Sequence, residues 1–316
     1  MSDKKRCGEC DAPITRLVLQ TWGAGKAAGM QVSVIISTYD SPAWLEKVLW
    51  GYAIQTHRDF EILVADDGSD QQTAVLIQRM QRATGLVIRH IWHEDRGFRK
   101  STILNRATVA AEGEYLVFTD GDCIPRHDFL ATHVALARPG RLLSGGSVRL
   151  SRDASDCIGP ADILARRTCD LRWLEAVGAG RSRGLRILGA GPRQAWLLDR
   201  VTTTRATWNG CNSSTFRCHV LEVNGHDERM RYGGLDREMG ERLVNLGIRP
   251  LQVRHRAICL HLDHDRPYAN PEGVLANLAI RAETRRARAV WSPHGIHGIH
   301  GIEQLAQPER QLRVAA

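Results

Sequence analysis

Long apolar runs are missing from this sequence, since none approaches the roughly 20 residues that a helix needs to cross a membrane. The polar start from Met1 to Arg6 is not followed by the apolar core of a signal peptide. We therefore expect a protein that has neither a membrane span nor a secretory leader.

Two phosphate-binding glycine patterns are also missing. No GxGxxG follows the first predicted strand, at residues 32–39, which argues against a dinucleotide-binding fold. The segment from Gly97 to Ser101 ends like a phosphate-binding loop but lacks its earlier glycine. An NTPase of the P-loop class is therefore not expected.

The eight cysteines are scattered without the spacing of a disulfide framework, which is typical of a protein from a reducing cytoplasm. Cys7 and Cys10 form a CxxC pair, but no second pair follows at the spacing of a zinc finger. A metal or redox use of this pair stays open.

Positive charge, in contrast, is in excess. The 316 residues carry a formal net charge of +8, which favours anionic partners: nucleotides, phosphorylated acceptors, nucleic acid or an anionic membrane face. No nucleic-acid recognition motif accompanies this charge, so nucleic acid is not expected as a partner. The 43% hydrophobic and 25% charged residues are the usage of a globular protein, and the length suits one large or two ordinary domains.

Strand and helix patterns alternate in the first half of the chain, after a polar, glycine-rich tail at 1–30. Apolar, β-branched runs predict strands at 32–39, 60–65, 86–91 and around 116–118. Helices are predicted between them, beginning at Pro42, spanning 73–80, and running through Asn105 to Ala111. The alternation predicts an α/β fold with a mostly parallel central sheet flanked by helices.

Acidic pairs end two of these strands. Asp66 and Asp67 follow the second strand, and Asp120-Gly121-Asp122 ends the fourth, before residues 123–125 turn the chain away. Buried carboxylates are costly without a cation, and ligands bind at the carboxyl edge of such sheets. A divalent cation that carries a diphosphate would satisfy these acids. A surface turn is the alternative, because Asp and Gly are common turn residues, but the repetition at two strand ends favours the cation.

Four segments in this order, 32–39, 66–69, 97–99 with Asn105, and 120–122, resemble the nucleotide-sugar half of a family 2 glycosyltransferase with the GT-A fold. The resemblance implies a UDP-sugar donor. It implies that Ser37, Thr38 and Asp67 face the uridine, with Asp67 accepting from the uracil imide. It also implies that Arg99 and Lys100 lie near the diphosphate, Asp120 near the ribose, and Asp122 on the metal.

Three further motifs, at 208–217, 224–228 and 232–239, resemble the C-terminal module of galactosyltransferase-like and chondroitin-polymerase-like enzymes. There a Gly-Gly turn presents an acid at the start of a helix, which is predicted here to run to Asn245. The resemblance implies that Asp236, followed by Glu238, is the catalytic acid pair, with Asp236 as the base. The residues that it implies for acceptor binding are Trp208, Asn212, Tyr232, Gly233 and Gly234.

The chain departs from this pattern twice, because Tyr232 replaces a usual Trp and Leu235 replaces a usual Glu that helps to hold the acceptor sugar. These departures put in doubt any acceptor preference inferred from relatives. An acid favoured by the dipole at a helix N-terminus is the structural alternative for Asp236.

A histidine that follows the apolar run 258–260 matches the third metal ligand of this family. His261 fits that place best and His264 is the second choice, while an isolated core histidine is the alternative. Imidazole together with carboxylates suits Mn²⁺ better than Mg²⁺.

The remaining segments are less regular. Residues 143–150 predict one strand with a bulge at its glycines. Residues 160–205 are rich in arginine, with Trp173 and Trp196 interleaved, and would either grip an anionic acceptor or lipid head groups or form a solvated face. Residues 266–316 are predicted as a helical tail, with a repeated His-Gly-Ile from His294, and no function is assigned to it.

The sequence therefore predicts a GT-A domain at 31–265, divided at residue 125 into a nucleotide-sugar half and an acceptor half. Its expected activity is inverting, metal-dependent transfer from UDP-galactose, its N-acetyl form or a relative to a surface glycan or glycolipid. A cytoplasmic protein with peripheral attachment to the inner face of the membrane is expected. The alternatives are a nucleotidyltransferase, or a degenerate sugar-nucleotide-binding module, which Leu235 suggests.

Overall fold

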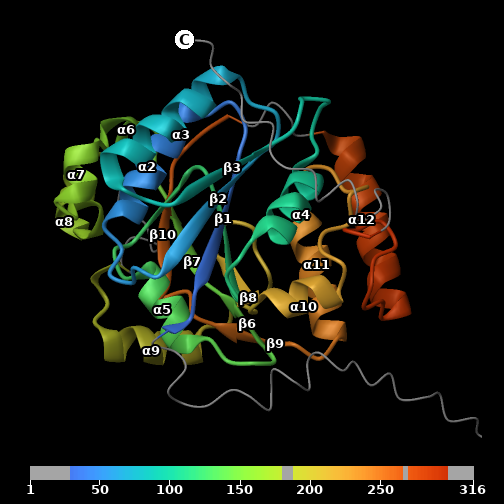
Figure 1. Cartoon of the computed structure of the whole chain (residues 1–316). Coiled ribbons are helices and arrows are strands. Elements are labelled where there is room, and N and C mark those ends of the chain that lie inside the picture. Colours follow the sequence, from blue (N-terminus) through green and yellow to red (C-terminus); the bar gives the residue numbers. More distant parts are fainter. Residues whose placement is uncertain (1–28, 180–187, 266–269, 298–316) are drawn as a thin grey trace, which may run out of the picture.

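The computed structural model describes residues 29–179, 188–265 and 270–297. Outside the described residues lie residues 1–28 of the predicted tail, with Cys7 and Cys10, and residues 298–316. The same holds for three arginines of the arginine-rich segment 160–205, called the basic segment below: Arg181, Arg183 and Arg186. The described chain is built around a seven-stranded sheet with the order β3-β2-β1-β4-β8-β6-β9 (Figure 1). Its strands are β1 (Val32–Thr38), β2 (Phe60–Asp66), β3 (Ile88–Trp92), β4 (Tyr115–Asp120), β6 (Arg141–Ser144), β8 (Ser213–Phe216) and β9 (Arg249–Gln252).

Parallel pairing dominates the first half of this sheet, as the alternation of strands and helices predicts. β1 pairs in parallel with β2 and β4, and β2 pairs in parallel with β3. β8 then lies antiparallel between β4 and β6, and β6 pairs in parallel with β9. The sheet is therefore parallel where the acidic strand ends meet, and mixed in the half that carries the acceptor motifs.

Helices cover both faces of the sheet (Figure 1). Helices α2 (Pro42–Ala53) and α3 (Gln71–Thr84) cover one face, and α4 (Lys100–Ala110), α10 (Arg217–Glu222) and α11 (Leu235–Asn245) cover the other. Strand residues alternate between the two cores, so that Val34 packs on the side of α2 while Ile35 packs on the side of α4. The apolar face predicted for α2 is buried, and its members are Leu45, Val48, Leu49 and Tyr52.

A second, three-stranded sheet has the order β5-β10-β7, formed by β5 (Cys123–Pro125), β7 (Gly146–Arg149) and β10 (Ile258–His261). Two predictions need correction here. Residues 123–125 form a strand rather than only a turn, and the single strand predicted at 143–150 is two strands, β6 and β7, in different sheets. The break falls at Gly145, where a Cβ atom would lie 2.0 Å from Asn212 Oδ1. Only glycine leaves room for that amide between the sheets.

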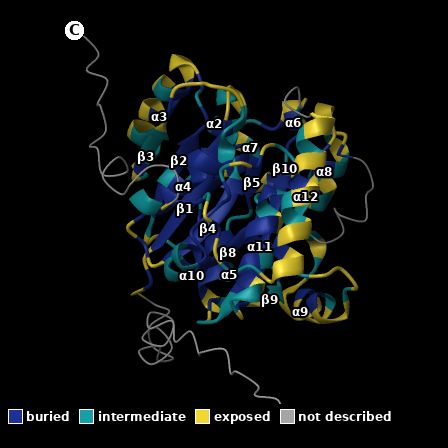
Figure 2. Cartoon of the chain, turned by 90° about the vertical axis from the view of Figure 1, so that its right-hand side faces the viewer, coloured by how far each residue is buried: buried dark blue, intermediate teal, exposed yellow. Residues whose placement is uncertain are grey.

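The outer helices are mostly exposed on their solvent side (Figure 2). They include α6 (Arg152–Cys157), α7 (Pro160–Leu164), α8 (Leu171–Ala176), α9 (Pro192–Val201) and α12 (Pro271–Ala287), with a 3-10 turn at Arg167–Cys169. In contrast, α5 (Phe129–Leu136) is mostly buried. The helix predicted in the C-terminal tail is α12, which packs against α11, and the following Ile296 is buried. Among the described helices, none has both the length and the apolar character that crossing a membrane requires.

Candidate active site

The carboxyl ends of β1, β2 and β4 bring the predicted donor residues to one edge of the sheet. These strands are parallel and in register, so Ser37 lies opposite Asp120 and Thr38 lies opposite Asp66. Ser37 Oγ and Lys100 Nζ each donate to Asp120 Oδ1, at 2.7 Å. Burial would lower the pKa of Lys100, but the charges of Asp120 and Asp236 outweigh it and raise that pKa above its usual value. Lys100 therefore stays charged at this edge.

The acidic pair that ends β2 has a local structural task. Asp66 is fully buried, accepts from the Ser69 amide at 2.8 Å, and lies 2.7 Å from His90 Nε2. Asp67 Oδ2 accepts from the Arg99 amide at 2.9 Å, and its Oδ1 lies 2.7 Å from His93 Nε2. Asp67 thus positions the start of α4, which carries Lys100, next to the end of β2. Its contact with a uracil stays a prediction, as do the contact of Thr38 with the uridine and the place of Arg99 near the diphosphate.

Asp122, His261 and His264 form a second group, just beyond β4 and β10. His264 Nε2 lies 2.8 Å from Asp122 Oδ2, and His261 Nε2 lies 3.9 Å from Asp122 Oδ1. The histidine nearer to Asp122 is thus His264, the less favoured of the two residues predicted from the sequence. The Nδ1 atom of each ring lies 2.8–2.9 Å from the carbonyl oxygen of the next residue, to which it can donate, so Nε2 is the ring nitrogen that faces Asp122.

This donor set fits a divalent transition metal, because two imidazole nitrogens converge on one carboxylate. Burial of Asp122 opposes its ionisation, but the hydrogen bond from His264 and the charges of both histidines prevail and lower its pKa to about 2. The backbone supports the group as well, since the Leu262 amide donates to the Asp122 carbonyl at 2.9 Å.

Asp236 lies in the first turn of α11, directly after the Gly-Gly turn. Gly233 and Gly234 have φ angles of +99° and +91°, which residues with a Cβ atom rarely adopt. Asn277 of α12 is buried and holds the turn in place. Its Nδ2 atom donates to three successive carbonyls, those of Arg231, Tyr232 and Gly233, at 2.8–3.1 Å. The described part of the predicted C-terminal tail therefore positions the candidate base.

The carboxylate of Asp236 is half-buried, and one of its oxygens lacks a hydrogen-bond partner among the described residues. Its Oδ1 atom lies 3.9 Å from Nε2 of the fully buried His226, and neither that oxygen nor either ring nitrogen of His226 has a hydrogen-bond partner among the described residues. Burial raises the pKa of Asp236 to about 6, with the charge of Asp120 adding to the effect and that of Lys100 opposing it. Such a group can accept a proton near neutral pH.

Glu238, the second acid of the predicted catalytic pair, lies inside the protein. It is 1% exposed, and Arg242 donates to both of its carboxylate oxygens at 2.7–3.0 Å. Thr284 Oγ1 of α12 also donates to it, at 2.8 Å. The structure thus places Glu238 in a buried ion pair that ties α11 to α12, while only Asp236 faces Lys100 and Asp120.

Removal of Glu238 should therefore weaken the fold. In Glu238→Ala the buried Arg242 guanidinium loses its counter-charge, and we expect a loss of about 3–5 kcal/mol in the free energy of unfolding. The matched control is Glu46→Ala, because Glu46 and Arg79 form an equally short ion pair of 2.7 Å on the surface. That control should cost about 1 kcal/mol or less. Urea unfolding followed by circular dichroism measures both, and equal midpoints would refute the structural role.

Two of the residues predicted to bind the acceptor are buried. Trp208 is 1% exposed and packs its ring edge against Phe118, with 5.3 Å between the centroids. Asn212 is 0% exposed and joins the two sheets, because its Nδ2 donates to the carbonyls of Gly146 and Ala257 and its Oδ1 lies 3.0 Å from His133 Nε2. Neither side chain is exposed to an acceptor in this structure. Tyr232 is half-buried and meets the ring edge of Phe98.

His226 and its support were not assigned a role from the sequence. Asn105 holds the backbone of His226 from both sides, donating from Nδ2 to its carbonyl at 2.9 Å and accepting from its amide at 2.7 Å. The sequence signals were the motif at 224–228 and the asparagine in α4. Neither indicates that the two segments, about 120 residues apart, meet beside Asp236.

Comparisons with known proteins agree with this arrangement. Residues 33–175 match the family model described as glycosyl transferase family 2. A validoxylamine A glucosyltransferase from Streptomyces hygroscopicus is 26% identical over 78% of this chain and 59% of its own length. Over 33% of this chain, a hyaluronan synthase from Pasteurella multocida is 30% identical, a match that covers 11% of that protein. The chain thus spans less than two thirds of the length of these relatives.

Solved structures show the same fold. The crystal structure of a fragment of TarS from S. aureus, in complex with UDP-GlcNAc, aligns with a TM-score of 0.57 at 15% identity and covers 82% of this chain and 69% of that one. The fold is therefore that of the GT-A glycosyltransferases, with a mostly parallel sheet between helices. Residues 33–175 are a glycosyltransferase family 2 domain.

Proposed function

We propose that the protein is an inverting, metal-dependent glycosyltransferase that uses a UDP-sugar. The observation that carries this proposal is the meeting of three different groups beside the ends of β1 and β4. These groups are Asp120 held by Lys100, Asp122 facing two imidazoles, and Asp236, one oxygen of which has no hydrogen-bond partner in the described part of the chain. They correspond to the three needs of sugar transfer: a place for the nucleotide, a place for its diphosphate, and a base.

Departure of UDP requires neutralisation of its diphosphate charge. A divalent metal ion held by Asp122, His261 and His264 would supply that charge as a Lewis acid. Lys100 supplies a permanent positive charge at the same edge, and Ser37 together with Lys100 keeps one oxygen of Asp120 in place. The other oxygen of Asp120 is then oriented to accept from a ribose hydroxyl. Of the two candidate metals, Mn²⁺ is favoured because two of the three ligands are nitrogen.

Asp236 takes the proton of the attacking acceptor hydroxyl. Its carboxylate lies against the loop before β8, where a Cβ atom on Gly210 would come within 2.6 Å of Oδ2. Attack on the anomeric carbon from the face opposite to UDP inverts its configuration, and no covalent sugar–enzyme intermediate is needed. The buried His226 lies near the other oxygen of Asp236, with its Nε2 atom 3.9 Å from Oδ1.

The donor that we propose is a UDP-hexose. UDP-galactose and its N-acetyl form are suggested by the resemblance of residues 208–239 to galactosyltransferase-like and chondroitin-polymerase-like modules. UDP-glucose and UDP-GlcNAc are added by the names of the Streptomyces relative and of the TarS complex. The acceptor that we propose is a surface glycan or glycolipid. Leu235, which replaces a usual acceptor-binding Glu, is the first residue of α11, is 4% exposed and packs in the core, so acceptor contacts must come from elsewhere.

A screen of these four UDP-sugars, with Mn²⁺ and without acceptor, tests the proposal. We expect slow release of UDP from one of them, and its loss on addition of a chelator. Pyrophosphate release from a nucleoside triphosphate with a sugar phosphate would instead indicate a nucleotidyltransferase. UDP-sugar binding in calorimetry without any turnover, with or without glycan acceptors, would indicate a degenerate binding module.

We further propose that the protein is cytoplasmic and binds the inner face of the membrane through the basic segment. Within its described part, α8, α9 and the turn at 166–167 expose five arginines: Arg166, Arg167, Arg172, Arg193 and Arg200. Helix α9 also exposes Trp196 at 44% and Leu197 at 53%, and Arg200 stacks on the Trp196 ring at 4.0 Å. Arginine beside exposed apolar side chains suits the interface of an anionic bilayer.

Sedimentation with anionic vesicles tests this attachment. Each arginine near such a surface contributes about 1 kcal/mol, and salt screens that attraction. A variant in which Arg166, Arg167, Arg172 and Arg193 are changed to Gln should therefore pellet far less than wild type at low salt. The control changes four exposed arginines elsewhere, Arg82, Arg285, Arg286 and Arg288, to Gln. Equal pelleting of the two variants would show that the segment is only a solvated face.

A further inference from the structure

Three thiols converge beneath the candidate active site. Cys123 begins β5, and Cys259 lies in β10 two residues before His261, which pairs with Cys123 across the small sheet. Residues that face each other across strands, and those two positions apart along a strand, share one face. Cys123 and Cys259 therefore point to the same side and are 0% and 1% exposed. Cys211 approaches from the loop before β8.

The third thiol is held in place by the large sheet. Thr119 Oγ1 of β4 donates to the Cys211 carbonyl at 3.1 Å, and the next residue, Asn212, is locked between the two sheets. Cys211 remains partly exposed.

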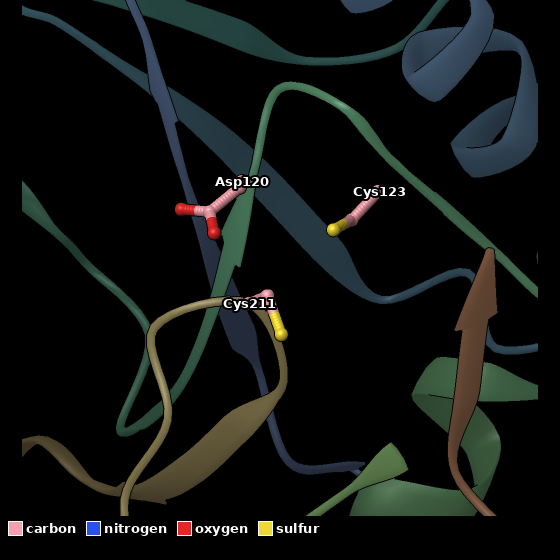
Figure 3. A group of neighbouring side chains, drawn as sticks. All are labelled: Asp120, Cys123 and Cys211. Atoms are coloured by element: carbon pink, nitrogen blue, oxygen red, sulfur yellow. The ribbon is translucent and has the colours of Figure 1, made fainter. Parts of the chain in front are cut away.

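Asp120 completes this group. An oxygen of Asp120 and the Sγ atoms of Cys123 and Cys211 all lie within 4.8 Å of one another, and Figure 3 shows the three side chains converging from separate segments. Both hydrogen bonds that Asp120 accepts from described residues end on Oδ1. Its Oδ2 therefore remains for another partner.

Apolar packing alone would explain buried thiols, because free cysteine behaves as a small hydrophobic residue. Each thiol also has a hydrogen-bond acceptor, since Cys123 Sγ donates to Asp122 Oδ1 at 3.2 Å and Cys211 Sγ donates to Asn209 Oδ1 at 3.3 Å. Neither contact accounts for the approach of both sulfurs to Asp120. Zinc binds thiolates at about 2.3 Å and carboxylates at about 2.0–2.2 Å, so that sulfurs around a tetrahedral ion lie about 3.8 Å apart. The observed cluster needs only a small closure to reach that geometry. The neighbouring Asp122, His261 and His264 offer the harder oxygen and nitrogen donors instead.

We propose that Cys123, Cys211 and Asp120 form a second metal site, for one thiophilic cation such as Zn²⁺, beside the site at Asp122, whose Oδ1 the Cys123 thiol also contacts at 3.2 Å. Cys259 lies beside it, with its Sγ 3.7 Å from the Cys211 carbonyl, and is the candidate for the fourth ligand. Binding of zinc would occupy the carboxylate that we assign to the ribose, so zinc would compete with the donor. That consequence rests on the proposed function, whereas binding of the ion does not.

The test uses Co²⁺ as a spectroscopic probe, without any nucleotide. The full chain carries Cys7→Ser and Cys10→Ser, because that pair could bind the ion by itself. Thiolate ligation of Co²⁺ produces a sulfur-to-metal charge-transfer band in the ultraviolet. We expect one equivalent of Co²⁺ to produce the band in the reduced protein, and one equivalent of Zn²⁺ to remove it.

Variants identify the ligands. Cys211→Ala should lose the band, and Asp120→Asn should weaken Co²⁺ binding by more than about 10-fold, the lower end of what loss of an outer partner costs. His261→Ala at the other site, and Cys157→Ala at an exposed thiol, should keep it. Circular dichroism melting checks that each variant folds, and Cys211 is chosen because it is less buried than Cys123.

Three outcomes would overturn the proposal. They are the absence of a charge-transfer band in the reduced protein, a band that survives in folded Cys211→Ala, and a band that disappears in His261→Ala. The first would show that the thiols only pack, and the last that the ion binds at the site of Asp122. Failure of the proposed glycosyltransferase activity would leave all of these readouts unchanged, since none requires a donor.

Discussion

Asp122→Ala is expected to abolish sugar transfer and to weaken binding of UDP in the presence of Mn²⁺. Asp122 is the carboxylate that both His261 and His264 face, at 3.9 and 2.8 Å. Without it, only the two imidazoles remain of the proposed ligands, and a divalent ion would be held too weakly to neutralise the diphosphate. Turnover and UDP affinity, measured with and without Mn²⁺, should converge to the same low values in this variant.

Asp263→Ala is the matched control for this experiment. Asp263 lies between the two histidines in sequence, but it is exposed to solvent. Its backbone amide donates to Ser155 Oγ and takes no part in the metal group. Wild-type turnover is therefore expected in the control. Full activity of Asp122→Ala, or undiminished wild-type turnover in excess chelator, would remove the metal assignment.

Asp236→Asn should lower the rate of transfer by about 10²–10⁴-fold, because the amide keeps the size of the side chain but cannot accept the proton. Affinity for the UDP-sugar, measured by calorimetry, should change little, since Asp236 is assigned to the acceptor hydroxyl. Glu241→Gln changes the charge on the same helix, in an ion pair with Arg281, and serves as the control. A collapse of donor affinity together with the rate would show that Asp236 is a donor contact or a structural residue.

The pH dependence gives a second readout of the same residue. Burial raises the pKa of Asp236 to about 6, so the carboxyl is mostly protonated at pH 5 and mostly ionised at pH 7. Only the ionised form is a base, so the wild-type rate should rise with pH, reach half of its maximum near pH 6 and level off above about pH 7. The residual activity of Asp236→Asn should lack this rise.

Much of the donor half could be predicted from the sequence because its determinants are local. Strands such as Val32–Thr38 are mostly apolar and are buried along their whole length, and acids end two of the neighbouring strands. Parallel pairing then brings Ser37 and Asp120 together. The same holds for β10 and its histidines. An apolar run that is followed by acids predicts both a strand and the position of those acids at the ligand-binding edge of the sheet.

The acceptor half was harder because its signals depend on partners distant in the chain. Spacing placed Asp236 and Glu238 together at one helix start, yet a two-residue step turns a helix by about 200°. One acid therefore faces Lys100 and the other is buried with Arg242. Trp208 and Asn212 occupy motif positions, but Trp208 is a core residue that packs against Phe118. Asn212 lies between the two sheets, next to His133.

The sequence by itself determined the α/β class, the order of the first strands and helices, and the family 2 character of residues 33–175, since these follow from periodicity and from short motifs at strand ends. Tertiary structure alone decided that α12 clamps the turn before Asp236, that Asn105 positions His226, and that Cys123, Cys211 and Asp120 converge. The physical reason is the range of the interactions. Strand and helix patterns are set within a few residues, whereas the environment of a buried side chain is set by segments that only the folded chain brings into contact.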